Sequence, residues 1–400
     1  GLSPHRRMPT APASLSVVAR RYETGEPVRI EIAGGVIERV SPAWPGQSLA
    51  ELPWVAPGLF DLQINGYGGV SFTSLTVTAE QVRQVIRGLA RHGIAQLCPT
   101  LVTASHAELA HGLRAIDAAC RADPLVAAMV PGIHLEGPWL SPEDGPRGAH
   151  PRQHIRPADW DEFQVLQQAA GGRICLTTIA PEVAGAVSFI TRAVAARVTV
   201  SLGHTAANGA QIEAAVVAGA RLSTHLGNGC AVQMPRHPNP IWEQLGESRL
   251  TACVIADGHH LPPSVVRSLV RAKGTLHTVL TCDASGWAGC PAGRYQTPMG
   301  EIEISANGRI GVAGNPHLLA GSGATTEVCV QQAAWMGACT LPQAFEMASR
   351  NPARVLGFRE YRLMPGDPAH LLLYRPGATA ADPLEIVGTL VAGQWAYGGS

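Results

Sequence analysis

The sequence predicts an α/β fold: a (β/α)8 TIM-like barrel with a small β-sandwich domain built from both termini. Eight short apolar runs alternate with helix-like stretches between residues 57 and 283, a pattern typical of parallel strands joined by crossover helices. Eight such units over roughly 300 residues match the strand number of this barrel. Short alternating runs with Gly and Pro turns occur at both ends of the chain, which predicts strands there too.

Each expected barrel strand is a run of seven to nine residues, with helices between most of them, for example over 79–92 and 208–219. A doubly wound sheet is the alternative, but it would place a Gly-rich phosphate turn after the first strand. The stretch GYGG at 66–69 does not match that fingerprint. The expected strands are 57–65, 94–101, 128–136, 174–180, 197–203, 220–226, 250–256 and 277–283.

The two ends of the chain are expected to build the small β domain together. Residues 15–50 contain SLSVVAR and PVRIEIAGGVIERV, and the last part contains HLLLYRP and LEIVGTLVAGQWAYGG. We therefore divide the chain into a small domain, 1–56 with 359–400, and the (β/α)8 barrel, 57–358. Residues 1–13 are expected to be flexible because they carry no apolar pattern.

The composition excludes several classes of partner. Thirty acidic residues balance thirty basic ones, so no net field attracts nucleic acid or an anionic membrane. No run approaches the roughly 18 apolar residues of a membrane span. Lys273 is the lone lysine, so any chemistry that needs a lysine would have to use it. The nine cysteines lack a CxxC pair, which favours reduced thiols and a cytoplasmic protein.

Polar residues gather where the expected strands end. Because barrel enzymes place their chemistry at the carboxyl ends of the strands, we expect these side chains to meet. Taken singly each has an ordinary explanation, since strand-end histidines are common in loops and Asp283 would suit a helix cap. The set comprises Asp61, Gln63, Asn65, His134, Glu136, His204, His225, Asp257, His259, His260 and Asp283.

The combination of Glu136, His204 and His225 predicts a metal site. One carboxylate and two imidazoles are three protein ligands for Zn²⁺ or a similar divalent ion, with the fourth position left open as in catalytic sites. Such an ion lowers the pKa of water and polarises a carbonyl. Asp283 is then the expected general base and later the acid. We expect one divalent metal per subunit, zinc first, with Fe²⁺, Mn²⁺ or Co²⁺ as alternatives.

At this point the chain resembles the N-acetylglucosamine-6-phosphate deacetylases of the amidohydrolase superfamily, from about Pro57 to Leu371. The combination of motifs is specific, although each alone is weak. The matching stretches are PGLFDLQINGYGG (57–69), HLEGPWL (134–140), TIAPE (178–182), SLGHT (201–205), THLGNG (224–229), IADGHH (255–260), CDAS (282–285), LAGS (319–322) and MPGDPAHLLL (364–373).

The resemblance implies roles for named residues. It assigns the metal to Glu136, His204 and His225 and the catalytic base to Asp283. Many amidohydrolases bind a second metal through a His-x-His pair, but here Gln63 and Asn65 occupy those positions, so we expect a single metal and a substrate-binding role for both amides. The resemblance assigns further substrate contacts to Ala149, His150, Asn228, Gly229, Arg236, His260, Leu319, Ala320 and Gly321.

The family also implies a homodimer, in which Arg236 and His260 reach the phosphate in the neighbouring active site. The implied activity is removal of acetate from N-acetylglucosamine 6-phosphate in amino-sugar catabolism. The loops 226–245 and 284–298 depart from the family pattern, and these loops are expected to line the substrate pocket. A galactosamine epimer, an unphosphorylated amino sugar, an N-acyl-D-amino acid and a non-catalytic sugar-phosphate-binding protein therefore stay open.

Overall fold

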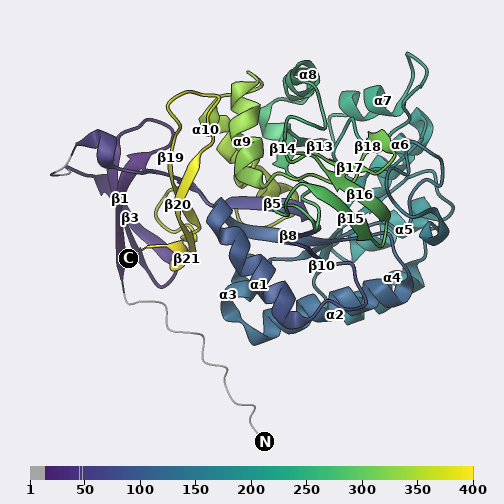
Figure 1. Cartoon of the computed structure of the whole chain (residues 1–400), viewed down its shortest axis with the longest axis horizontal. Helices are drawn as coiled ribbons and strands as arrows, with labels where there is room; N and C mark the ends of the chain where they lie inside the picture. Colours follow the sequence, from purple (N-terminus) through teal and green to yellow (C-terminus); the bar gives the residue numbers. More distant parts are fainter. Residues whose placement is uncertain (1–13, 45, 47, 400) are drawn as a thin grey trace, which may run out of the picture.

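The computed structural model describes residues 14–44, 46 and 48–399, so the segment 1–13 expected to be flexible lies outside the described residues. Eight parallel strands form a barrel in the order β14-β13-β12-β11-β10-β9-β8-β5 (Figure 1). A parallel bridge between Ile64 and Ala284 joins the two edges and nearly closes it. The strands are β5 (Leu59–Ile64), β8 (Ile94–Val102), β9 (Ile133–Glu136), β10 (Ile174–Ile179), β11 (Thr199–Leu202), β12 (Leu222–Ser223), β13 (Thr251–Ile255) and β14 (Thr278–Thr281).

The predicted barrel is confirmed, but the third expected strand, 128–136, is wrong over its first half. Pro124–Met129 forms the helix α3, and β9 begins only at Ile133. The carboxylate of Asp123 caps this helix by accepting hydrogen bonds from the backbone N–H groups of Leu125 and Val126. An apolar run this short does not distinguish a buried helix from a buried strand, so the cap decides the outcome.

Helices follow the strands and surround the barrel. Capping boxes start α1 at Thr78 with Gln81 and α6 at Asn208 with Gln211, which confirms the two helices expected at these places. In the described part of the chain no helix is long and apolar enough to cross a membrane. The helices are α1 (Ala79–Leu89), α2 (His106–Ala122), α4 (Trp160–Ala169), α5 (Ala186–Ala195), α6 (Gly209–Ala218), α7 (Pro240–Gly246), α8 (Pro263–Lys273), α9 (Thr326–Trp335), α10 (Leu341–Met347) and α11 (Arg350–Val355).

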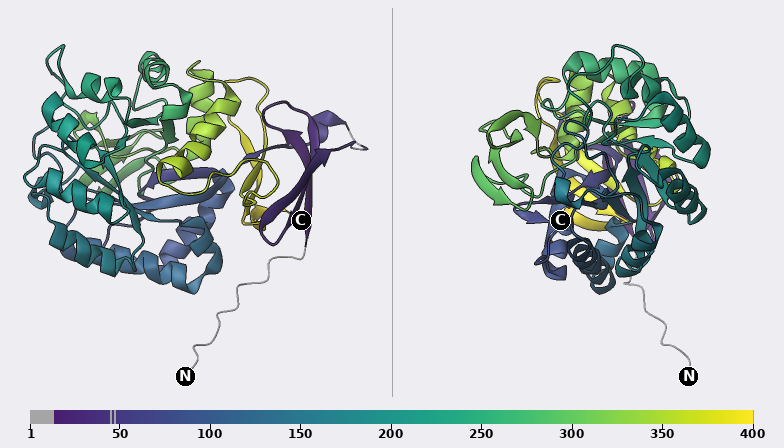
Figure 2. Two further views of the ribbon diagram at one scale, coloured as in Figure 1. Left: turned by 180° about the vertical axis from the view of Figure 1, so that it is seen from behind. Right: turned by 90° about the vertical axis from the view of Figure 1, so that its right-hand side faces the viewer.

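The expected small β domain from both termini is also confirmed. Its strands form one continuous seven-stranded sheet in the order β21-β20-β19-β4-β1-β2-β3, and the purple and yellow halves lie side by side at one end of the molecule (Figures 1 and 2). The division of the chain at residues 56/57 and 358/359 stays a prediction. The strands are β1 (Leu15–Arg21), β2 (Pro27–Ala33), β3 (Val36–Pro42), β4 (Trp54–Pro57), β19 (Leu371–Arg375), β20 (Glu385–Val391) and β21 (Gln394–Gly398).

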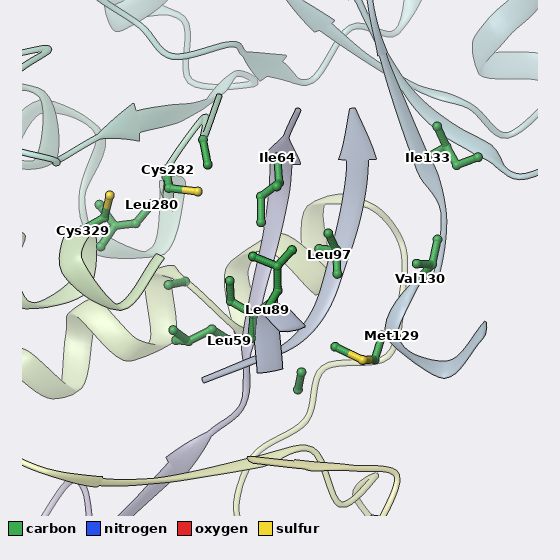
Figure 3. Packing of buried hydrophobic residues seen from close by; sticks show 14 of the residues in the cluster. Leu59, Ile64, Leu89, Leu97, Met129, Val130, Ile133, Leu280, Cys282 and Cys329 are labelled. Atoms are coloured by element: carbon green, nitrogen blue, oxygen red, sulfur yellow. The ribbon is translucent and has the colours of Figure 1, made fainter. Parts of the chain in front are cut away.

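Apolar side chains pack both faces of the barrel strands. On the outside, Leu59 and Ile64 of β5 and Leu97 of β8 belong to the large core that includes Leu89 of α1 (Figure 3). Inside, a separate cluster fills the lower barrel, and the Tyr361 hydroxyl donates to the carbonyl of Gly58 at 2.9 Å. The filled interior leaves the carboxyl ends of the strands as the place for a site. The inner cluster consists of Phe60, Leu62, Cys98, Leu176, Leu222, Cys253, Val279, Ala353, Leu356 and Tyr361.

A four-stranded antiparallel sheet, which we call the rim sheet, lies in the connection between β14 and α9 and was not predicted. It consists of β15 (Gly293–Thr297), β16 (Gly300–Ile304), β17 (Ile310–Val312) and β18 (Asn315–Leu319). Buried Ile302, Ile304 and Ile310 form its own small core, against which Trp287 packs. This core fixes the rim sheet beside the loop that carries Asp283.

Candidate active site

Three of the predicted site residues share an unusual backbone conformation. His204, His225 and Asp283 each lie two residues beyond the end of a barrel strand, with φ of 48°, 27° and 51°. A non-glycine residue in this left-handed region costs about 1–3 kcal/mol and persists where the surrounding structure over-determines it. The turn folds each side chain back over the mouth of the barrel, so the strain points to function at all three positions.

Glu136, His204 and His225 converge as expected from the sequence. One ligand atom from each lies within 4.8 Å of the others. Glu136 Oε2 is 3.2 Å from His225 Nε2 and 3.4 Å from His204 Nε2. All three side chains are buried, and buried carboxylates need a compensating positive charge.

The hydrogen bonding of His204 points to a cation between these side chains. Its Nδ1 is 2.8 Å from the carbonyl oxygen of Pro146 and must donate to it, so in the neutral ring Nε2 carries a lone pair. That lone pair faces Glu136 and has no hydrogen-bond partner among the described residues. Two acceptors facing each other repel unless a cation lies between them, so this donor set fits a divalent metal.

The pKa values within the cluster also indicate a site for a cation. Burial opposes ionisation of Glu136, but the surrounding imidazoles of His150, His204 and His225 hold its pKa well below the usual range. Burial likewise opposes the imidazolium of His225, yet its hydrogen bond to Glu136 and the charge of that group raise its pKa to about 9. Surroundings that favour a positive charge on His225 also suit a cation between these side chains.

Gln63 and His150 complete the surroundings of the carboxylate. Gln63 Nε2 donates to Glu136 Oε2 at 2.7 Å, so the first strand supplies an amide hydrogen bond to the ligand rather than a second set of metal ligands. His150 Nε2 is 3.4 Å from Glu136 Oε1, and its Nδ1 is 2.7 Å from the hydroxyl of Thr103. Both residues therefore orient Glu136, as outer-shell groups do at metal sites.

Asp283 lies at the same mouth and is held by two neighbours. Asn65 Nδ2 donates to its Oδ1 at 2.8 Å, and Asp61 accepts a hydrogen bond from the N–H of Cys282 at 2.9 Å. Burial and the charge of Glu136 raise the pKa of Asp283 to about 6, against the opposing charge of His225. A carboxylate with this pKa can exchange a proton near neutral pH, which a general base requires.

The cluster opens into a cavity of about 640 Å³ at the carboxyl ends of the strands. Five of the ten buried polar atoms without a partner in the described part of the chain belong to Gln63, Asn65, His204, His225 and Asn228. These polar atoms are free to bond to a molecule at the barrel mouth. The predicted residues that line the cavity are Asn65, Glu136, Ala149, His150, His204, His225, Asn228, Gly229, His260, Asp283, Leu319, Ala320 and Gly321.

His260 lies at the cavity of its own chain, where its Nδ1 donates to Asp257 Oδ2 at 2.8 Å. That it reaches a neighbouring active site stays a prediction. The hydrogen bond and charge of His260 outweigh burial and lower the pKa of Asp257 to about 2. Arg236 is different, since it is exposed on the loop before α7 and is not among the residues that line this cavity.

Sequence reasoning missed two parts of the site. It gave no individual role to Asp61, yet the Asp61 carboxylate accepts from Thr281, Thr326 and two backbone N–H groups. It also missed the wall that the rim sheet contributes through Met299, Arg309 and His317. The buried position of Asp61 between apolar residues was the available signal for the first. The alternating sequence of β16 was the signal for the second.

Comparisons with known proteins agree with this geometry. The model of the amidohydrolase family matches residues 54–396. The N-acetylglucosamine-6-phosphate deacetylase of Homo sapiens is 36% identical over 316 residues, which cover 76% of this chain and 75% of that protein. The N-acetylgalactosamine-6-phosphate deacetylase of Escherichia coli O157:H7 is 32% identical over 330 residues, covering 82% of this chain and 85% of that protein.

Solved structures give the same result for the fold. The N-acetyl-D-glucosamine-6-phosphate deacetylase of Mycobacterium smegmatis, a mutant in complex with N-acetyl-D-glucosamine-6-phosphate, is 30% identical with a TM-score of 0.84 and covers 96% of this chain and 100% of that one. The N-acetylglucosamine-6-phosphate deacetylase of Pasteurella multocida is 22% identical, with a TM-score of 0.82 and coverage of 95% and 99%. At that identity the likeness shows the fold alone.

Proposed function

The chain belongs to the amidohydrolase family, in the group that contains the N-acetylglucosamine-6-phosphate deacetylases, and on that premise we propose that it hydrolyses N-acetylglucosamine 6-phosphate to glucosamine 6-phosphate and acetate. The observation that carries this proposal is the convergence of Glu136, His204 and His225 beside the half-buried Asp283. A hydrolase of this type needs an electrophile for the carbonyl and a base for water, and the four side chains offer both.

Glu136, His204 and His225 would hold one divalent ion. Bound there, the ion would polarise the acetyl carbonyl and lower the pKa of water. We propose zinc, because two imidazoles and one carboxylate are a common catalytic zinc set, with Fe²⁺, Mn²⁺ or Co²⁺ as alternatives. The lone pair of His204 Nε2 supports this role, since Pro146 fixes the tautomer that exposes it.

Asp283 moves the proton. Its carboxylate accepts a proton from the water that attacks the acetyl carbon, and it returns that proton to the sugar nitrogen as the C–N bond breaks. Asn65 keeps Oδ1 in position through its 2.8 Å hydrogen bond. The raised pKa of Asp283 suits a group that must first accept a proton and then release it.

Other groups would hold the sugar. The unpartnered Nδ2 of Asn228 is buried at the cavity, so it can donate to a substrate oxygen without breaking an internal bond. His260 has its Nδ1 fixed by Asp257, which leaves Nε2 to meet the substrate from the same chain. The backbone of Gly229 and of residues 319–321 supplies further contacts along the same wall.

A homodimer that brings Arg236 to the neighbouring site is part of the proposal. Two apolar side chains near Arg236 are exposed: Val232 of the same loop is 93% accessible and Trp242 of α7 is 57% accessible. Exposed apolar residues beside a cation are suited to an interface with a second copy. We also propose a cytoplasmic location, since all nine cysteines are free thiols.

The galactosamine epimer is the second candidate substrate, and the relative from Escherichia coli O157:H7 is the reason to test it. The comparisons do not favour an N-acyl-D-amino-acid deacylase or a non-catalytic binding protein. The deciding experiment is acetate release from metal-replete protein with N-acetylglucosamine and N-acetylgalactosamine, each with and without the 6-phosphate. The largest kcat/KM for N-acetylglucosamine 6-phosphate supports the proposal, and release from N-acetyl-D-amino acids alone refutes it.

A further inference from the structure

The rim sheet places a positively charged side chain at the cavity of its own chain. Arg309 precedes β17 and lines the cavity together with His317. Among the lining residues within the described ranges, Arg309 is the only arginine or lysine, whereas the acidic groups there are Glu136 and Asp283. One permanent cation at the cavity wall is therefore available to an anionic part of the substrate.

The guanidinium of Arg309 is held but not neutralised. It is half-buried, and its Nη2 donates to the carbonyl of Pro316 across the β17–β18 turn. Nη1 packs against Gly311, where an added Cβ would lie 3.0 Å away. Among the ion pairs of the described residues none includes Arg309, whereas Arg294 of the same sheet pairs with Glu301 and Glu303.

An arginine in this state is prepared to bind an anion. Guanidinium carries five N–H donors, and the carbonyl of Pro316 uses one of them. Charge-assisted hydrogen bonds to phosphate are about twice as strong as neutral ones, and the planar fork matches two phosphate oxygens. A side chain that the protein already holds in place loses less conformational entropy when it binds a ligand.

We infer that Arg309 is a phosphate-binding residue that acts within its own chain, and this inference rests on the proposed function. The phosphate of the sugar would meet Arg309 from the rim sheet of the chain that also provides Asp283. Arg236, expected from a second copy, would then add to an anion site that is already present in the monomer. Preference for the phosphorylated sugar thus depends on the rim sheet of this chain.

The test compares Arg309→Gln with Arg294→Gln, which removes an equal charge from the same sheet but outside the cavity. In Arg309→Gln the KM for N-acetylglucosamine 6-phosphate is expected to rise roughly 10–100-fold, the worth of a hydrogen bond to a charged group. Its kcat, and its kcat/KM for unphosphorylated N-acetylglucosamine, should stay near wild type. Arg294→Gln should leave all of these constants near wild type. The KM of Arg309→Lys for the phosphorylated sugar should lie between those of Arg309→Gln and wild type.

Binding of inorganic phosphate, measured by calorimetry on the metal-loaded protein, tests the anion site without turnover. Wild type and Arg294→Gln should bind phosphate alike, and Arg309→Gln should bind it at least about tenfold more weakly. The inference is overturned if Arg309→Gln binds phosphate as wild type does. It is also overturned if the variant lowers kcat/KM equally for the phosphorylated and the unphosphorylated sugar. Phosphate binding does not require deacetylation. The measurement therefore distinguishes failure of the anion site from failure of the proposed function.

Discussion

The carboxylate of Asp61 accepts a hydrogen bond of 2.9 Å from the backbone N–H of Cys282, the residue before the proposed base. Asp61 is fully buried within β5 and also accepts hydrogen bonds from the hydroxyls of Thr281 and Thr326. Burial raises its pKa, and the donors around it counter that effect. The first strand thus holds the strained turn that carries Asp283.

Replacing Asp61 with Asn should therefore impair both folding and catalysis. The new amide group would place a donor against existing donors, which costs about 1–3 kcal/mol of unfolding free energy. We expect kcat to fall at least about tenfold, because small shifts of a catalytic group are expensive. Urea unfolding and steady-state kinetics measure the two effects, with metal content as a control. A variant with reduced stability but unchanged kcat would show that Asp61 does not position the base.

Asp283→Asn should remove turnover and leave the metal site intact. The amide cannot accept the proton of water, and general acid–base groups contribute roughly 10²–10⁴-fold to rate. The measurement is kcat together with metal content per chain. Asp161→Asn, which changes an exposed carboxylate at the start of α4, serves as a matched control. Near-normal kcat in Asp283→Asn would disprove the assignment of the base.

Gly229→Ala should disturb the metal site through His204. A Cβ at Gly229 would lie 2.7 Å from His204 Nδ1, so the ring must move away from Pro146. Loss of such an orienting contact typically lowers metal affinity 10–100-fold. Gly172→Ala is the control. Gly172 also has a positive φ, +79°, but open space around it, so this substitution introduces backbone strain without a steric clash. Equal metal affinity in both variants, by competition with a chelating dye, would argue against this coupling.

The barrel and the metal ligands could be predicted because each signal is local. Glu136 follows an apolar run directly, and His204 and His225 each follow another, so the periodicity places all three at strand ends. Their actual proximity depends on closure of the barrel between Ile64 and Ala284. Eight parallel strands joined by helices are known to close into a barrel, so the strand count predicts this closure.

Other features depend on contacts that no local pattern contains. The cap at Asp123 starts α3, which includes the first two residues of the expected strand 128–136, and the alternation in β16 spans only five residues. The hydrogen bond between His260 and Asp257 also does not follow from their spacing, because it depends on the fold of the loop after β13. The cavity wall at Arg309 likewise follows from the fold of the rim sheet.

His370 should contribute a measurable loss of stability in acid. Its Nδ1 accepts from the backbone N–H of Ala392 at 3.0 Å, so the folded ring is neutral, and burial lowers its pKa to about 4. As pH falls below about 6.5, the unfolded state takes up a proton that the folded state does not. Stability therefore decreases from about pH 6.5 to about pH 4, by up to about 3 kcal/mol.

His370→Asn tests this acid effect, because its side-chain oxygen can still accept from Ala392 but does not titrate. Urea unfolding at pH 7 and pH 4.5 should show a smaller difference for the variant than for wild type. The same pH dependence in both proteins would show that His370 is not responsible.

The central claim is that Glu136, His204 and His225 hold one catalytic divalent ion. The most direct measurement is metal content per chain by elemental analysis, combined with acetate release, for wild type and Glu136→Gln. His277→Asn, which changes an exposed histidine, is the control. We predict about one equivalent of metal and full activity in wild type and control, and almost none of either in Glu136→Gln. Undiminished metal and turnover in Glu136→Gln would contradict the account.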